Sequence, residues 1–368
     1  MSTQSQPEAR LVAVKSFRIF VETDMQTLQK INKSIRREAY VWVPLSHDNI
    51  LPLEGVIVDD EFGPFPAFVS PWMENQTLND YLKWKVGLSR AKKLTMAKEI
   101  AAGLQYLHDK GIVHGDLTDA NVLVSSDGRL CLGDFGLSMI LAEARNTTFN
   151  SCHAGNMRWM APELVLVEEE DAMSKPTKAG DVYSYGCIMM RVFSGHKPYH
   201  HIKRDAAIIT AMYDNQKPFS RLVDISEEIQ HLAQRCWSSN MEYRPLVGKI
   251  AESLRLQTAI AETVKMMVLQ LPVTVTQISQ ADLTKCDDGL DVLGAPLRYK
   301  WVVHGSSETE VAVKTLRDDV DSQNDINKIY HRIHREIYVR EKLRHETILA
   351  LYGMTEGSGI FPSFVYPW

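Results

Sequence analysis

Four sequence blocks occur twice in this chain, once near its start and once near its end. The order of the blocks is the same in both places, and matching residues lie about 300 positions apart. That distance is far longer than the unit of a solenoid, so the repeat is that of a whole domain. The matching blocks are Val12–Lys15 with Val311–Lys314, Arg37–Val41 with Arg335–Val339, His47–Gly55 with His345–Gly353, and Phe65–Trp72 with Phe361–Trp368.

The repeat predicts how the chain is divided. The second copy contains only the front part of the first, because its fourth block reaches Trp368. We therefore expect one nearly whole domain over residues 11–257 and a partial second domain over 290–368. Residues 258–289 between them mix polar and scattered apolar side chains without a sustained period, which predicts a linker with one short helix.

Periodicity within the first copy predicts a few short strands followed by many helices. Such an order is typical of the α+β class, with a small sheet lobe and a larger helical lobe. The expected strands are 11–15, 67–72, 112–113, 122–124 and 130–132, and the first expected helices are 27–45, 78–84 and 89–108.

Charge and cysteine content exclude several classes of protein. The 41 basic and 46 acidic residues leave a net charge of −5. The chain therefore has no excess of basic residues that would predict a nucleic-acid or membrane partner. The start of the chain lacks an apolar signal segment, and Met266–Val275 is too short and interrupted to span a bilayer. The 5 cysteines are odd in number, widely spaced and without a CxxC pair. These features favour a reducing compartment, the cytoplasm or the nucleus, with no disulfide framework or zinc site.

Three motifs carry residues suited to phosphate chemistry: His114–Asn121, Asp134–Gly136 and Ala161–Glu163. Each is common when it occurs alone. In this order and spacing they resemble the catalytic lobe of protein kinases. Further matches are Val12–Lys15, the helix with Glu38, Asp181–Gly186, Cys236-Trp237, Arg244-Pro245 and the stretch Met157–Glu163, of which the last three are most similar to the tyrosine-kinase-like branch. The resemblance covers about 11–257 and again 290–368.

The resemblance implies a bilobal fold, followed by a second, partial kinase N-lobe, and a site that uses ATP and Mg²⁺. Lys15 would contact the α- and β-phosphates and be held by an ion pair with Glu38. Asn121 and Asp134 would bind Mg²⁺, for which oxygen ligands are suited. Asp116 would orient the substrate hydroxyl and accept its proton, an effect worth roughly 10²–10⁴ in rate.

The same resemblance implies a nucleotide pocket and its scaffold. Ser70 would be the gatekeeper beside the adenine, and the hinge would contain Trp72 and Met73. Ala13 and Leu123 would enclose the adenine ring. The scaffold positions are His114 and Phe135 in a hydrophobic spine, Asp181 as the anchor of the catalytic-loop backbone, and Glu163 with Arg244 as a partly buried ion pair.

Several positions depart from the family pattern. None of the fourteen residues before Lys15 is glycine, so the first copy lacks the Gly-rich loop and its two strands; the second copy keeps only Gly294 of that pattern. Gly115 stands where many kinases have Arg, and Thr118 and Ala120 stand where a catalytic-loop cation is usual. The second copy has no catalytic loop, and its Arg340 stands where the first copy has Trp42.

The leading interpretation is a protein kinase that phosphorylates a protein hydroxyl in signalling, with Ser/Thr favoured over Tyr by branch resemblance alone. One alternative is a catalytically weak or inactive pseudokinase scaffold, and another is a truncated product of a tandem-kinase gene. The expected partners are a protein substrate and a docking partner that covers apolar surface of the partial second lobe around Ile360–Trp368.

Overall fold

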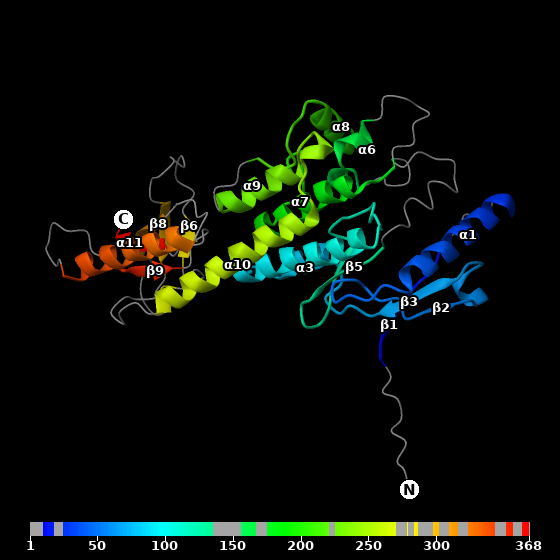
Figure 1. Cartoon of the computed structure of the whole chain (residues 1–368), viewed down its shortest axis with the longest axis horizontal. Coiled ribbons are helices and arrows are strands. Elements are labelled where there is room, and N and C mark those ends of the chain that lie inside the picture. Colours follow the sequence, from blue (N-terminus) through cyan, green and yellow to red (C-terminus); the bar gives the residue numbers. More distant parts are fainter. Residues whose placement is uncertain are drawn as a thin grey trace, which may run out of the picture. The chain divides into compact units, whose positions relative to one another are not determined.

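The computed structural model divides the chain into two compact units (Figure 1). The first unit contains Met1–Val86, Thr95–Ser220 and Leu232–Ala251, and the second contains Gly87–Leu94, Arg221–His231 and Glu252–Trp368. The structure describes residues 10–17, 25–134, 156–166, 175–220, 225–269, 278, 283–285, 297–301, 309–315, 323–342, 351–355 and 363–367.

The first unit begins with a small antiparallel sheet in the order β1-β3-β2. These strands are β1 Val12–Lys15, β2 Gly55–Ile57 and β3 Ala67–Pro71. Helix α1, Met25–Trp42, has buried residues at Ile31, Ile35, Glu38 and Trp42, a spacing that places them on one face. The ring of Trp42 meets that of Phe68 edge to face at 5.7 Å, so this face of α1 packs on β3.

Most of the remaining described chain before residue 270 is helical. The helices are α2 Leu78–Trp84, α3 Arg90–Asp109, α6 Pro162–Val165, α7 Lys178–Ser194, α8 Asp205–Tyr213, α9 Glu227–Cys236 and α10 Val247–Leu269, with 3₁₀ turns η1 Asp60–Phe62, η2 Met157–Trp159 and η3 Met241–Tyr243. Strands β4 Val122–Val124 and β5 Leu130–Leu132 form an antiparallel pair. Helix α7 is buried from Gly180 to Phe193, so it is the central support of the first unit.

The elements of the first unit follow the predicted α+β order, with one wrong strand, one strand (β2) that was not predicted, and one helix longer than expected. Residues 112–113 are not a strand, because they complete the end of α3: Gly111 has φ +75°, and the Ile112 amide donates to the Leu107 carbonyl at 2.9 Å. This is the arrangement of a glycine-terminated helix. Helix α10 continues to Leu269, and Leu283–Lys285 form a strand, so both occupy parts of the stretch 258–289 that was predicted to be a linker with one short helix.

The second unit contains a five-stranded antiparallel sheet in the order β6-β7-β8-β10-β9. Its elements are β6 Leu283–Lys285, β7 Leu297–Trp301, β8 Thr309–Thr315, α11 Gln323–Lys342, β9 Gly353–Thr355 and β10 Ser363–Pro367. Ile278, Val311, Val313 and Val365 form a buried apolar cluster in this sheet.

The sequence repeat is also a repeat of strand pairing. Val12 lies opposite Pro71 in the first unit, and Val311 lies opposite Pro367 in the second. In the same way, Gly55 pairs with Val69 and Gly353 pairs with Val365. A slip of one residue would turn every side chain to the other face, so the shared register shows that the two copies present their matching residues alike.

Candidate active site

Lys15 and Asp134 form an ion pair at the edge of the small sheet. The Lys15 Nζ lies 2.6 Å from Asp134 Oδ1, and the two side chains are 40 % and 39 % exposed. Lys15 is the last residue of β1, and Asp134 follows β5 with a left-handed φ of +58°. Asp is among the residues that tolerate this backbone conformation, so the turn can direct the carboxylate toward Lys15. The pair therefore presents a cation and a hard oxygen donor side by side.

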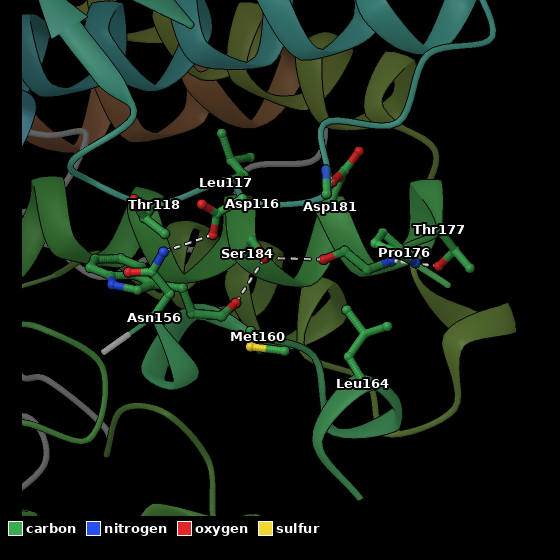
Figure 2. A pocket seen from close by; sticks show the side chains of 13 residues that line it. Asp116, Leu117, Thr118, Asn156, Met160, Leu164, Pro176, Thr177, Asp181 and Ser184 are labelled. Carbon is green, nitrogen blue, oxygen red and sulfur yellow. Dashed lines mark hydrogen bonds between the residues drawn. The ribbon is translucent and has the colours of Figure 1, made fainter. Parts of the chain in front are cut away.

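The Asp116 carboxylate is held by two side-chain amides. Asn121 Nδ2 donates to Asp116 Oδ2 at 3.1 Å and to its backbone carbonyl at 2.7 Å. Asn156 Nδ2 donates to Asp116 Oδ1 at 2.9 Å, and Figure 2 shows this amide directed at the carboxylate. Each carboxylate oxygen of Asp116 therefore accepts one side-chain hydrogen bond, and together these bonds orient the carboxylate.

One backbone hydrogen bond connects these two groups. The Gly133 amide donates to the Asn121 carbonyl at 3.0 Å, immediately before Asp134 in the chain. Lys15 and Asp134 are thereby linked to Asn121 and Asp116 within the first unit. Two carboxylates and one ammonium thus lie on connected segments of the first unit.

Asp181 anchors the loop that carries Asp116, as the resemblance predicted. Its carboxylate accepts hydrogen bonds from the backbone amides of His114 and Gly115, both at 2.9 Å, and lies 2.8 Å from His108 Nε2. Gly115 has φ +78°, a conformation in which a side chain is strained. The loop geometry therefore explains why glycine is suited to the position where many kinases have Arg.

Glu38 differs from the expectation. We expected it to pair with Lys15, but Lys15 pairs with Asp134, and Glu38 has neither an ion pair nor a hydrogen bond with the described residues. Burial raises the pKa of Glu38 to about 8, while the nearby Lys15 opposes and Asp134 adds to this shift. Asp134 is more exposed than Glu38, so binding the ammonium there costs less desolvation.

The residues expected around adenine lie in β1, β3 and β4 and in the segment that follows β3. Ala13 is paired opposite Ser70, which is buried. Trp72 and Met73 follow β3, and Trp72 is 46 % exposed. Leu123 lies in β4, where it forms a bridge to Thr77, so the segment after β3 runs alongside β4.

A small pocket lies next to Asp116 (Figure 2). Thr118, one of its lining residues, is 2 % exposed and accepts a hydrogen bond from the Ala120 amide at 3.2 Å. Ser184 of α7 also lines the pocket and donates to the Trp159 carbonyl at 2.8 Å. This hydrogen bond attaches η2 to α7. Thr118 is thus a buried structural hydroxyl, which agrees with the absence of a cation at this position.

Asn156 and Ser184 are site residues that sequence reasoning missed. Asn156 comes immediately before the stretch Met157–Glu163, which matches the kinase pattern. Its position next to that stretch is the one sequence signal that could have pointed to it. An asparagine in a loop is more often a turn former, so its amide could not be assigned to Asp116 without the fold. Ser184 lies inside the recognised stretch Asp181–Gly186 but had been given no role.

The predicted ion pair between Glu163 and Arg244 is confirmed. It is bidentate, with Arg244 Nη1 at 2.6 Å from Glu163 Oε1 and Nη2 at 2.8 Å from Oε2. His114 is fully buried, as a spine residue would be. Phe135, expected in the same spine, lies outside the described residues.

Comparison with known proteins identifies the family. Residues 1–254 match the family described as protein tyrosine and serine/threonine kinase. The chain belongs to the protein kinase family, and its helix and strand content agrees with the bilobal fold of that family. Among the helices that the structure describes, none is long and apolar enough to cross a membrane.

Individual relatives match the same part of the chain. Human receptor-interacting serine/threonine-protein kinase 1 is 29 % identical over 255 residues, which are 64 % of this chain and 37 % of that protein. Chicken ephrin type-B receptor 2 is 32 % identical over 232 residues, covering 61 % and 22 % respectively. Serine/threonine/tyrosine-protein kinase HT1 of Arabidopsis thaliana is 30 % identical over 248 residues, covering 67 % and 60 %. The chain thus spans less than two thirds of the length of each.

Proposed function

We propose that this chain is a protein kinase that transfers the γ-phosphate of ATP to a Ser or Thr hydroxyl of a protein substrate in intracellular signalling. The observation that carries the proposal is the link between the Lys15–Asp134 ion pair and the amide-held Asp116. Phosphoryl transfer depends mainly on positioning and charge neutralisation, and this arrangement offers both. Family membership supports the same reaction class.

The donor set around Asp134 fits Mg²⁺. Asp134 offers a carboxylate, and Asn121 uses its amide nitrogen to hold Asp116, which leaves its side-chain oxygen for a ligand. Mg²⁺ prefers such hard oxygen donors and keeps several waters. Asn121 and Asp134 would hold the ion, which when bound neutralises negative charge on the phosphates. Lys15 would bind the α- and β-phosphates, and Glu38 lies close enough to act on it electrostatically.

Asp116 would orient the attacking hydroxyl and accept its proton. The amides of Asn121 and Asn156 hold one carboxylate oxygen each, so the carboxylate has a defined orientation toward the substrate. A fixed base of this kind reduces the entropy lost in reaching the reactive geometry. The pairing of Ala13 with Ser70 and the position of Leu123 beside the segment after β3 support an adenine site there, with Trp72 and Met73 in the hinge.

The choice of Ser or Thr over Tyr rests on the resemblance to the tyrosine-kinase-like branch. The names of two relatives include serine/threonine activity, and one of these names also includes tyrosine. Thr118 provides no local evidence, because it replaces the cation that distinguishes many kinases of the two kinds. Phosphoamino-acid analysis of the labelled substrate separates the alternatives.

We also propose that residues 290–368 are a partial kinase N-lobe. The identical strand registers of β8 with β10 and of β1 with β3 support this assignment, as does the position of Glu336 in α11, which matches Glu38 in α1. A docking partner for this lobe is part of the proposal. A reducing location such as the cytoplasm is supported by Cys131, Cys187 and Cys236, which are buried free thiols.

A pseudokinase scaffold is the second candidate. The unpaired Glu38 carboxylate, among the described residues, and the buried Thr118 favour it, because both differ from the charge arrangement expected of an efficient kinase. The two functions differ in phosphate transfer, whereas both allow nucleotide binding.

The decisive experiment uses the purified chain with radiolabelled ATP, Mg²⁺ and a mixture of dephosphorylated proteins. Asp116→Asn should abolish transfer and keep nucleotide binding, because it removes the proton acceptor but no phosphate ligand. Lys15→Met should weaken nucleotide binding as well. Equal transfer by wild type and Asp116→Asn would contradict the assignment of the base. ATP binding without measurable transfer by the wild type would favour the scaffold.

A further inference from the structure

One surface loop of the first unit is unusually rich in cations. Between α7 and α8, the segment Gly195–Arg204, here called the cationic loop, contains no Asp or Glu, whereas the whole chain has a net charge of −5. Six of its side chains carry or can acquire positive charge, and all six belong to exposed residues. They are His196, Lys197, His200, His201, Lys203 and Arg204.

The backbone of the cationic loop is held in place. The Arg158 guanidinium donates to three of its carbonyls, at Pro198 (3.3 Å), Tyr199 (2.9 Å) and Ile202 (2.8 Å). Tyr199 is only 1 % exposed, and its hydroxyl donates to the Gln216 carbonyl at 3.2 Å. The cations therefore project from a defined backbone, and binding a ligand requires little ordering of the main chain.

The anchor of the loop belongs to the same short segment as a residue that contacts the proposed catalytic base. Arg158 lies in η2, two residues after Asn156, which donates to the Asp116 carboxylate. Arg191 of α7 links the same two segments a second time, because its guanidinium pairs with Asp119 at 3.3 Å and donates to the Gly195 carbonyl of the cationic loop. The cationic loop thus lies beside the segment at which a substrate hydroxyl would be held.

Among the side chains that the structure describes, the permanent charges of the loop have no ion-pair partner. This holds for Lys197, Lys203 and Arg204, and the side chain of the next residue, Asp205, lies outside that set. Partial burial lowers the pKa of His200, and the neighbouring His196 and His201 lower it further. The rings of His196 and His200 stack with centroids 4.6 Å apart. Lys197, Lys203 and Arg204 provide the permanent charge of the loop, and the histidine rings add groups that can form hydrogen bonds.

We propose that the cationic loop binds acidic side chains of the protein substrate that flank the acceptor hydroxyl. This inference rests on the proposed kinase function and specifies its substrate class as acidic segments. Exposed ammonium and guanidinium groups pair with carboxylates, and the cationic loop concentrates such groups in a chain whose net charge is −5. The fixed position of the loop beside Asp116 would make that attraction specific to residues near the acceptor.

The test measures binding without depending on catalysis. A fluorescent peptide with a central Ser and Thr flanked by glutamates is compared with the same peptide carrying glutamine for every glutamate, by anisotropy at low and physiological salt. The loop variant is Lys197→Glu, Lys203→Glu and Arg204→Glu. The control variant, Lys33→Glu, Lys85→Glu and Lys110→Glu, makes the same charge change at exposed residues elsewhere in the first unit. Circular dichroism checks that both variants are folded.

We expect the wild type and the control variant to bind the acidic peptide about tenfold more tightly than the glutamine peptide, the sum of a few exposed ion pairs. The loop variant should lose this preference, and added salt should weaken it. In phosphate-transfer assays, the KM for the acidic peptide should be lower than the KM for the glutamine peptide by a similar factor. If the chain binds the acidic peptide through the loop but transfers no phosphate, the kinase proposal fails and the binding site remains.

Three results would overturn the inference. Wild-type chain that binds both peptides equally has no acidic preference. An equal loss in the control variant would show nonspecific attraction rather than a site. Loop-dependent binding of phosphatidylserine vesicles, with peptide binding unchanged in the loop variant, would assign the loop to a membrane surface instead.

Discussion

Asn156 donates a hydrogen bond to the carboxylate of Asp116 at 2.9 Å, although the two residues are 40 positions apart in the chain. Asn121 holds the other carboxylate oxygen, at 3.1 Å. The orientation of the proposed base therefore depends on two separate segments. One is the catalytic loop itself, and the other is the turn η2, which Ser184 attaches to the central helix α7.

Asn156→Ala should lower kcat for phosphate transfer by about 10- to 100-fold and leave the KM for ATP nearly unchanged, because it frees one oxygen of the base without touching the nucleotide. Steady-state kinetics at varied ATP checks this. Asn156→Thr, which keeps a shorter donor, should recover part of the rate. An unchanged kcat in Asn156→Ala would show that the hydrogen bond from Asn156 is not needed to orient Asp116.

Glu38 should make stability depend on pH in an unusual direction. Burial raises its pKa from 4.5 to about 8, with Lys15 opposing and Asp134 adding to the shift. Because the folded pKa is raised, the folded state retains a proton that the unfolded state releases. The stabilising contribution is therefore complete below about pH 4.5 and is lost as the pH rises through about 8.

Glu38→Gln should remove this dependence. Relative to the variant, the free energy of unfolding of the wild type should fall by up to about 1.4 kcal/mol per pH unit between these values. Urea unfolding of the first unit at a series of pH values measures it. Glu61→Gln, at an exposed position, controls for the loss of one negative charge. Parallel curves for wild type and Glu38→Gln would contradict the raised pKa.

Local sequence signals predicted the regular elements near the site well. The helix expected at 78–84 is α2, because Thr77 caps it by accepting a hydrogen bond from the Asp80 amide. The strands 122–124 and 130–132 are β4 and β5. These elements are short and have clear boundaries, so neighbouring residues were sufficient to define them.

The partner of Lys15 could not be predicted in the same way. The resemblance implied Glu38, whereas Lys15 pairs with Asp134, and the choice depends on how deeply each carboxylate is buried in the folded chain. The role of Asn156 likewise depends on a tertiary contact between distant segments. The residues expected to act on ATP and Mg²⁺ were named by family resemblance, and their roles remain predictions.

The ion pair between Glu163 and Arg244 should be important for stability. The Arg244 side chain is 0 % exposed, whereas that of Glu163 is 23 % exposed. Glu163→Ala would leave a buried guanidinium without its carboxylate, so it should destabilise the first unit by about 3 kcal/mol. The double variant Glu163→Ala with Arg244→Met should be less destabilised than the sum of the two single changes, measured by urea unfolding. Additive effects would show that the two groups do not depend on each other.

Substitution of Gly115 can separate the effect of backbone strain on stability from an effect on catalysis. Gly115 has φ +78°, and a residue with a side chain in this conformation would cost about 1 kcal/mol or more of unfolding free energy. Gly115 also precedes Asp116 in the chain, and its amide donates to Asp181. Gly115→Ala should therefore lower both the unfolding free energy and kcat. Gly128 also has φ +78° but lies in the turn between β4 and β5, so Gly128→Ala is a matched control. It should lose similar stability and keep kcat. Equal losses of kcat in both variants would mean that the effect comes from general destabilisation rather than from the position of Asp116.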